Sequence, residues 1–205
     1  MIIFSRHGQT AANRDGRLLG RHDAPLTEHG AAQAAAMARA LGNVALGNTA
    51  PTEVYSSPLR RAITTADVIA DAVGVEVRID ERLVELDYGE WDGRAHDEIS
   101  TEDWLRWRDD PHFAPPGGES LATVRARVVT FAEEHIASDA QVVAVSHVSP
   151  IKSAFAWALG MSDSVAFRAH LDLASFTRVA RGPLLFSFNE TGHLSELSAA
   201  GKASG

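Results

Sequence analysis

The chain has 205 residues, of which 45% are hydrophobic and 22% charged; these proportions are typical of soluble globular proteins and exclude general disorder. Its formal net charge of −8 argues against a general nucleic-acid or acidic-membrane binder, because such proteins depend on a basic surface. It contains no cysteine, which excludes a disulfide framework, a thiolate metal site and a thiol nucleophile.

The first predicted element is a short buried strand over residues 1–5, which ends at Arg6-His7-Gly8. We find no signal-peptide pattern before this strand. The apolar stretches further along the chain are too short to cross a bilayer. Together with the lack of cysteine, these features lead us to expect a cytoplasmic protein.

Helices and strands are predicted to alternate after the first strand. Apolar residues at helical spacing indicate a helix over 26–41, with Thr27 as its N-cap and Gly42 as its stop. The clearest helix has Ser57 as its N-cap and ends at Gly74. The remaining predicted elements are strands at 52–56, 75–79 and 141–146, helices at 121–135 (capped by Ser120) and 149–159, and an antiparallel pair of strands at 170–180 and 184–188.

Residues 90–119 differ from the rest of the chain in composition. They hold three of the four tryptophans and a loop rich in proline and glycine. We interpret this segment as a mainly helical insertion that lies over the sheet and can serve as a lid. Residues 1–197 are therefore expected to form a single domain, and the small, polar segment 198–205 a disordered tail.

The alternation of strands and helices predicts an α/β fold. We expect a three-layer sandwich with a mostly parallel central sheet, helices on both faces and the small helical lid insertion. In such sheets ligands bind in the crevice beyond the carboxyl ends of the strands. Three polar segments are predicted to fall at those ends, namely Arg6-His7, Ser57 to Arg61, and Ser146-His147. They are expected to share one crevice.

His7 is the candidate nucleophile of this crevice. An imidazole is partly unprotonated at neutral pH, and its attack on a phosphoryl group gives a phosphohistidine that water readily hydrolyses. We expect Arg6 to favour the neutral imidazole by charge repulsion and to bind phosphate oxygens with its guanidinium. Gly8 is expected to let the backbone turn close beside the substrate. Taken alone, this triplet also fits an ordinary solvated turn after a strand.

Two further residues are candidates for binding phosphate. Arg61 is placed in the first turn of its helix, where free N–H groups favour an anion. Arg60 is the competing candidate, and we favour Arg61 because it precedes Ala62 on the buried stripe. His147 follows a hydrophobic strand. Its alternative role is that of a hydrogen-bonded core histidine. We consider it a phosphate ligand because it is expected to lie next to His7 at the same edge of the sheet.

Glu85 is the candidate general acid. Its apolar neighbours Leu83, Val84 and Leu86 are expected to desolvate the carboxyl group and raise its pKa, so that it can protonate a leaving oxygen. The nearby arginines oppose that rise, whereas a bound phosphate dianion supports it. Asn13 can donate to a phosphate; its alternative role is that of a turn residue.

Five motifs occur in order along the chain: Arg-His-Gly-Gln-Thr at 6–10, Ser-Ser-Pro-Leu-Arg-Arg-Ala at 56–62, Glu85 followed by Gly89-x-Trp91-x-Gly93, Pro-Gly-Gly-Glu-Ser at 116–120, and Ser146-His147. Together they resemble the histidine phosphatase superfamily, in the branch that includes cofactor-dependent phosphoglycerate mutases and bacterial phosphatases. The resemblance spans Met1 to about Phe188. It implies His7 as nucleophile, Glu85 as proton donor, and a phosphate pocket of Arg6, Arg61 and His147 assisted by Asn13. It also implies that neither a metal nor another cofactor is needed.

The chain departs from the family pattern at two positions. Val148 stands where the family usually has glycine after the second histidine, although its backbone N–H can still serve. Leu19 occupies a place where many relatives carry glutamine. Both positions adjoin the substrate region, so they bear on specificity and not on the phosphoryl chemistry.

The predicted function is hydrolysis of a small organic phosphate ester, with no nucleic acid or membrane as partner. The alternative within the family is a mutase, which must keep its phosphohistidine from water; the short insertion and small tail favour a phosphatase. A non-catalytic phospho-ligand sensor would be expected to lack His7 or Glu85. A metallohydrolase would have to use the scattered His22, His96 or His112, because no two histidines have the spacing typical of zinc ligands. The natural substrate and the oligomeric state, a homodimer included, are left open.

Overall fold

The computed structural model describes residues 1–43, 50–195 and 197, and the predicted tail at 198–205 lies outside them. A six-stranded sheet has the order β3-β2-β4-β1-β5-β6. The four strands from β3 to β1 pair in parallel, whereas β5 and β6 run antiparallel. The predicted, mostly parallel sheet is therefore confirmed. The strands are β1 (Ile2–Arg6), β2 (Glu53–Ser56), β3 (Val77–Ile79), β4 (Val142–Ser146), β5 (Phe176–Ala180) and β6 (Leu184–Glu190).

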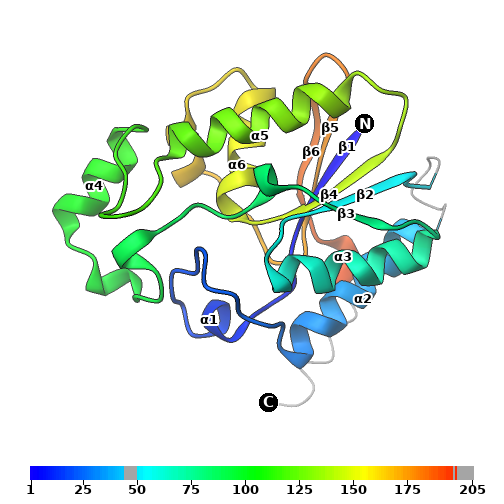
Figure 1. Cartoon of the computed structure of the whole chain (residues 1–205), viewed down its shortest axis with the longest axis horizontal. Helices are drawn as coiled ribbons and strands as arrows, with labels where there is room; N and C mark the ends of the chain where they lie inside the picture. The colour runs from blue at the N-terminus through cyan, green and yellow to red at the C-terminus, as the bar shows by residue number, and fades with distance from the viewer. Residues whose placement is uncertain (44–49, 196, 198–205) are drawn as a thin grey trace.

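Helices flank the sheet on both sides (Figure 1). The α-helices are α1 (Ala11–Arg14), α2 (Glu28–Gly42), α3 (Arg60–Val73), α4 (Thr101–Asp109), α5 (Leu121–Ile136) and α6 (Val148–Ala158). Short 3-10 turns are η2 (Glu81–Leu83), η3 (Gly89–Trp91), η4 (His96–Glu98), η5 (Asp163–Phe167) and η6 (Gly192–Leu194). Within the described ranges, none of these helices combines the length and apolarity needed to cross a membrane.

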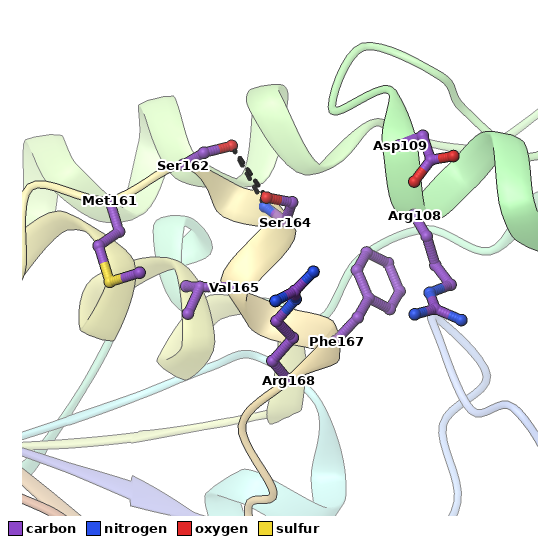
Figure 2. A pocket seen from close by; sticks show the side chains of 8 residues that line it. All are labelled: Arg108, Asp109, Met161, Ser162, Ser164, Val165, Phe167 and Arg168. Carbon is purple, nitrogen blue, oxygen red and sulfur yellow. Dashed lines mark hydrogen bonds between the residues drawn. The ribbon is translucent and has the colours of Figure 1, made fainter.

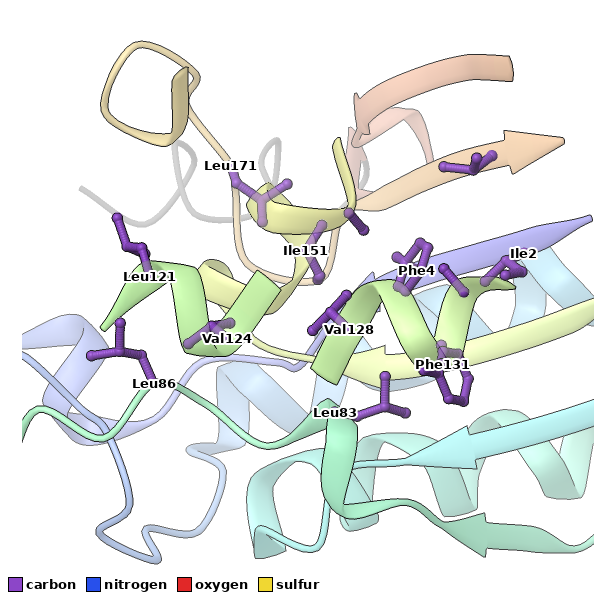
Figure 3. Packing of buried hydrophobic residues seen from close by; sticks show 14 of the residues in the cluster. Ile2, Phe4, Leu83, Leu86, Leu121, Val124, Val128, Phe131, Ile151 and Leu171 are labelled. Carbon is purple, nitrogen blue, oxygen red and sulfur yellow. The ribbon is translucent and has the colours of Figure 1, made fainter. Parts of the chain in front are cut away.

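The two faces of the sheet each bury a hydrophobic core. Successive side chains of a strand point to opposite faces, so Ile2 and Phe4 of β1 pack in one core with α5 and α6, and Ile3 packs in the other with α2 and α3. Figure 3 shows Val128 and Phe131 of α5 facing the β1 side chains of the first core. The result is the three-layer α/β sandwich that the sequence predicts.

The capping predictions are correct for some helices and wrong for one. The hydroxyl of Thr27 accepts from the N–H of Gly30 at the start of α2, and Ser120 caps α5 in the same way. The predicted cap of α3 is wrong, because α3 begins at Arg60 with Leu59 at the N-cap position. The hydroxyl of Ser57 lies 2.7 Å from a ring nitrogen of His147 and accepts from the N–H of Leu59, one residue before α3 begins.

The last predicted strand pair is shorter than expected. β5 begins at Phe176 instead of residue 170. Ala174 has a φ of 55°, which is the left-handed region and interrupts an extended strand. The backbone before β5 nevertheless remains tied to β1, because the N–H of Ala174 donates to the carbonyl of His7 at 3.2 Å.

Residues 90–119 hold η4 and α4 at one end of the molecule (Figure 1). The three tryptophans of this segment pack together, with ring centroids of Trp91 and Trp107 5.9 Å apart and of Trp104 and Trp107 5.2 Å apart. Phe167 of η5 extends the cluster by an edge contact with Trp107 at 4.9 Å. This aromatic cluster attaches the insertion to the body of the protein; its action as a lid stays a prediction.

Candidate active site

The polar segments predicted at the strand ends meet beyond β1 and β4. The N–H of His7 donates to the carbonyl of Ser146 at 3.1 Å, so the ends of the two strands are joined directly. The rings of His7 and His147 lie 5.0 Å apart between centroids. Arg61 reaches the same point from α3, with its Nε 3.3 Å from Nε2 of His7. Residues separated by about 140 positions in sequence thus share one site.

His7 is held in a single tautomer. Its Nδ1 lies 2.7 Å from the carbonyl oxygen of Gly8, and because a carbonyl can only accept, the proton must be on Nδ1. The lone pair is then on Nε2, where the Nε–H of Arg61 donates to it. Burial, followed by the charges of Arg61 and Arg6, holds the pKa of His7 well below its usual value. The imidazole is therefore neutral, and burial and Arg61 contribute more to this than Arg6, the cause expected from the sequence.

The loop that carries His7 is pressed against the first turn of α2. A Cβ placed on Gly8 would lie 2.3 Å from the carbonyl oxygen of Gly30, so the backbone of α2 leaves no room for a side chain at this position. The N–H of Thr27 donates to the carbonyl of Gln9 at 2.9 Å. The N–H of Gly8 lies 3.3 Å from the Thr65 hydroxyl. These contacts hold in place the backbone of the loop that carries the His7 imidazole.

Arg61, and not Arg60, enters the site. Arg61 is fully buried, whereas Arg60 is exposed. The two terminal nitrogens of Arg61 donate to the carbonyls of His22 at 2.9 Å and Gly20 at 2.8 Å. Leu19, one of the two departures from the family pattern, is buried next to the second of these carbonyls. The guanidinium is thus fixed in position by the loop that follows α1.

His147 presents a buried donor to the site. Its Nε2 lies 2.7 Å from the hydroxyl of Ser57, which also accepts from the N–H of Leu59. When this hydroxyl donates its proton to Nε2, the ring proton of His147 lies on Nδ1. That nitrogen is buried and has no hydrogen-bond partner among the described residues. Burial and the charge of Arg61 keep the pKa of His147 well below its usual value, so the ring is neutral.

Arg6 presents a second donor of this kind. One terminal nitrogen of its guanidinium donates to the carbonyl of Leu171 at 2.6 Å. Its Nε is buried and, within the part of the chain that the structure describes, has no partner. Buried donors in native proteins are nearly always satisfied, so the Nε of Arg6 and the Nδ1 of His147 are candidate donors to the oxygens of a phosphate.

Glu85 is buried, with 2% of its surface exposed. Its Oε1 accepts from the backbone N–H groups of Leu86 at 2.7 Å and Ser149 at 3.2 Å, and its Oε2 accepts from that of Val148 at 3.2 Å. Burial raises the pKa of Glu85, while the hydrogen bonds with Leu86 and Ser149 and the charges of Arg61 and Arg6 oppose the rise. The backbone N–H of Val148, which the sequence left available, therefore orients this carboxyl group.

Asn13 belongs to the short helix α1, which the sequence did not predict. Its Oδ1 accepts from the N–H of Thr10 at 3.0 Å and from the Thr10 hydroxyl at 2.9 Å, which completes a reciprocal cap of this helix. The carboxamide is thereby oriented, and its role as a phosphate donor stays a prediction.

A cavity of about 400 Å³ adjoins Arg6. Sequence reasoning missed Lys152, whose Nζ donates to the carbonyl of Ala166 at 2.8 Å on the wall of this cavity. The sequence did contain a signal for Lys152. It lies four residues after Val148 on an apolar helix, and this spacing places the two side chains on the same face of the helix. The cavity is lined by Arg6, Arg17, Leu18, Tyr88, His96, Trp104, Trp107, Leu121, Val148, Ser149, Lys152, Ala166, Phe167, His170 and Leu171.

A second cavity, of about 380 Å³, lies on the far side of Phe167 between α4 and η5. Figure 2 shows Arg108 and Arg168 beside Phe167 at this place. None of the residues that line it belongs to the site around His7. Across residues 1–43, 50–195 and 197, no group of three or more His, Cys, Asp or Glu side chains is arranged to hold a metal ion.

Comparison with known proteins gives one consistent result. A family model described as the histidine phosphatase superfamily (branch 1) matches residues 2–189. The bifunctional protein Rv2228c of Mycobacterium tuberculosis (strain ATCC 25618 / H37Rv) is 39% identical over 181 residues, which are 86% of this chain and 49% of that protein. The chain therefore spans about half the length of this relative.

Two other relatives match over most of their own length. Phosphoserine phosphatase 1 of Hydrogenobacter thermophilus (strain DSM 6534 / IAM 12695 / TK-6) is 35% identical, with 95% of this chain and 94% of that protein covered. The structure of mycobacterial glucosyl-3-phosphoglycerate phosphatase Rv2419c with VO3 has a TM-score of 0.77 and 34% identity, and the match covers 86% of this chain and 88% of that chain.

Proposed function

Since the chain belongs to the histidine phosphatase superfamily (branch 1), as its five motifs predict, we propose that it hydrolyses a small organic phosphate ester to an alcohol and inorganic phosphate. Relatives named phosphoserine phosphatase and glucosyl-3-phosphoglycerate phosphatase support this reaction class. The observation that carries the proposal is the neutral, buried His7, whose Nε2 lone pair faces Arg61.

The proposed first step transfers the phosphoryl group to His7. Nε2 attacks phosphorus, an N–P bond forms, and the bond from phosphorus to the ester oxygen breaks. The guanidinium groups of Arg6 and Arg61 and the Nδ1–H of His147 stabilise the phosphoryl oxygens. Glu85, whose pKa is raised by burial, gives its proton to the departing alkoxide.

The proposed second step reverses these roles. Glu85, now a carboxylate, takes a proton from a water molecule, whose oxygen attacks phosphorus. The N–P bond breaks, inorganic phosphate is released, and His7 recovers its neutral imidazole. Each proton lost by one group is therefore gained by another, and no step requires an external oxidant or reductant.

The experiment follows the phosphoryl group with a labelled ester. We expect a rapid quench without acid to leave the label on the peptide that contains His7, and His7→Ala to lose both this label and phosphate release. His29→Ala removes an exposed histidine of α2 and is the matched control, expected to retain both. Label that persists in His7→Ala would overturn the assignment of the nucleophile.

The mutase is the competing function, because it forms the same phosphohistidine. We favour hydrolysis because Arg6, beside the reaction site, opens into a cavity of about 400 Å³ that can admit water. Incubation with 3-phosphoglycerate and 2,3-bisphosphoglycerate separates the two: we expect released phosphate to exceed 2-phosphoglycerate. Isomerisation much faster than phosphate release from any ester would establish the mutase.

We propose that the enzyme acts in the cytoplasm. The net charge of −8 and the lack of cysteine support a cytoplasmic enzyme that acts on a small molecule, with no nucleic acid or membrane as partner.

A further inference from the structure

The cavity beside Arg6 has a wall of aromatic rings and a set of cations. Tyr88, Trp104, Trp107 and Phe167 contribute the rings. The charged side chains on the wall are Arg6, Arg17 and Lys152, and among the described residues that line the cavity none is acidic. A ligand of this cavity is therefore expected to combine an organic body with negative charge.

Lys152 is a hydrogen-bond donor on this wall. It uses one of its three N–H groups on the carbonyl of Ala166. A group that complements this wall is therefore expected to supply acceptor oxygens.

We propose that this cavity holds the organic part of the substrate, and that this part carries a carboxylate whose counter-charge is Lys152. The inference rests on the phosphatase function proposed above, because it places the phosphoryl group at His7 and the rest of the ester next to Arg6. A carboxylate supplies both the charge and the oxygens that the wall lacks. The charged side chains of this wall are all cationic, so phosphorylated hydroxy acids, which carry no ammonium group, fit better than phosphorylated amino acids.

Lys152 is suited to this role by its surroundings. Burial and the charge of Arg6 lower the pKa of Lys152 to about 8, while Glu85 opposes this shift. The other titratable side chains on the cavity wall are Arg17, Tyr88, His96 and His170. At neutral pH the lysine is still largely protonated, and a carboxylate would relieve both the desolvation of its charge and the repulsion from Arg6.

The test uses two esters that differ at a single carbon. In 3-phosphoglycerate this carbon is a carboxylate, and in glycerol 3-phosphate it is a hydroxymethyl group. Each is measured as a competitive inhibitor of 4-nitrophenyl phosphate hydrolysis, which gives an inhibition constant even for a poor substrate. We expect the wild-type protein to bind the carboxylate ester at least about tenfold more tightly, the size of one charge-assisted hydrogen bond.

Substitution of Lys152 identifies the residue responsible. We expect Lys152→Met to reduce the preference to about twofold or less, mainly through weaker binding of 3-phosphoglycerate, and Lys152→Arg to retain most of it. Arg168→Met removes an exposed positive charge on the far side of Phe167. This control is expected to leave the preference unchanged, which separates a local contact from a general loss of charge. Phosphoserine is expected to bind less tightly than 3-phosphoglycerate.

The possible failures are distinguishable. If 4-nitrophenyl phosphate is not hydrolysed in a manner that depends on His7, the proposed function itself is wrong. If it is hydrolysed but wild-type protein binds the two esters equally, the carboxylate inference is wrong and the phosphatase stands. That comparison needs no variant, so a Lys152→Met protein that fails to fold does not prevent a decision. An equal preference in folded Lys152→Met and wild type would exclude Lys152 as the counter-charge.

Discussion

Replacing Glu85 by glutamine tests the proposed general acid and also changes the stability of the protein. The carboxyl group accepts three backbone N–H bonds, from Leu86, Val148 and Ser149. A glutamine side chain has one acceptor oxygen, and its NH2 group would face a donor. At least one buried N–H then loses its partner, which is expected to cost about 1–3 kcal/mol of unfolding free energy.

The catalytic effect of Glu85→Gln should depend on the leaving group. An alkyl alcohol leaves poorly without a proton, so we expect the rate on glycerol 3-phosphate to fall by about 10²–10⁴-fold. This corresponds to about 3–5 kcal/mol of transition-state stabilisation. A nitrophenolate needs little protonation, and the loss on 4-nitrophenyl phosphate is expected to be less than about tenfold.

Phosphate release is measured on both esters, and denaturant melts report the unfolding free energy. Glu90→Gln, which changes an exposed carboxyl group five residues away, is the matched control and should alter neither quantity. Comparable losses on the two esters would refute the role of Glu85 as general acid. A positioning residue weakens both reactions alike, because it acts through the placement of other groups.

Three further predictions follow from the site and its supports. Gly30→Ala would place a Cβ 2.1 Å from the Gln9 carbonyl oxygen and should lower the unfolding free energy by about 1–3 kcal/mol in denaturant melts. Gly192 has open space around it, so Gly192→Ala is the control and should leave the unfolding free energy unchanged. Activity should survive exhaustive chelation and be inhibited by vanadate; loss with EDTA and recovery with zinc would support a metallohydrolase. Binding of 3-phosphoglycerate should weaken as the pH rises through about 8, where Lys152 loses its proton, while a parallel decline for glycerol 3-phosphate would contradict this origin.

Most of the fold was predictable from local patterns. Apolar stripes and the capping hydroxyls of Thr27 and Ser120 located α2 and α5, because these signals act within one helical turn. Ser57 carries the same signal and gave the wrong result, since its hydroxyl contacts His147, 90 positions away. A local sequence pattern cannot show that a side chain makes a contact with a residue far away in the chain.

The sequence allowed us to predict which residues form the candidate site, but few of the contacts between them. The ends of β1 and β4 brought His7 and His147 together because parallel strands place their carboxyl ends at one edge. The contact of Gly8 with Gly30 depends on how α2 packs against that edge, which no spacing in the sequence records. Lys152 was missed for a similar reason: its significance lies in the cavity, and the cavity is formed by segments far apart in the chain.

The hydrogen bond from Arg61 to Nε2 of His7 means that the resting site protects its own most reactive atom. The lone pair that must attack phosphorus accepts the Nε–H of Arg61, while the terminal nitrogens of this guanidinium stay on the carbonyls of His22 and Gly20. A phosphate oxygen can compete for that N–H, whereas a neutral alkylating reagent offers no anionic oxygen to it. We therefore expect such a reagent to modify His7 more slowly than the exposed His29.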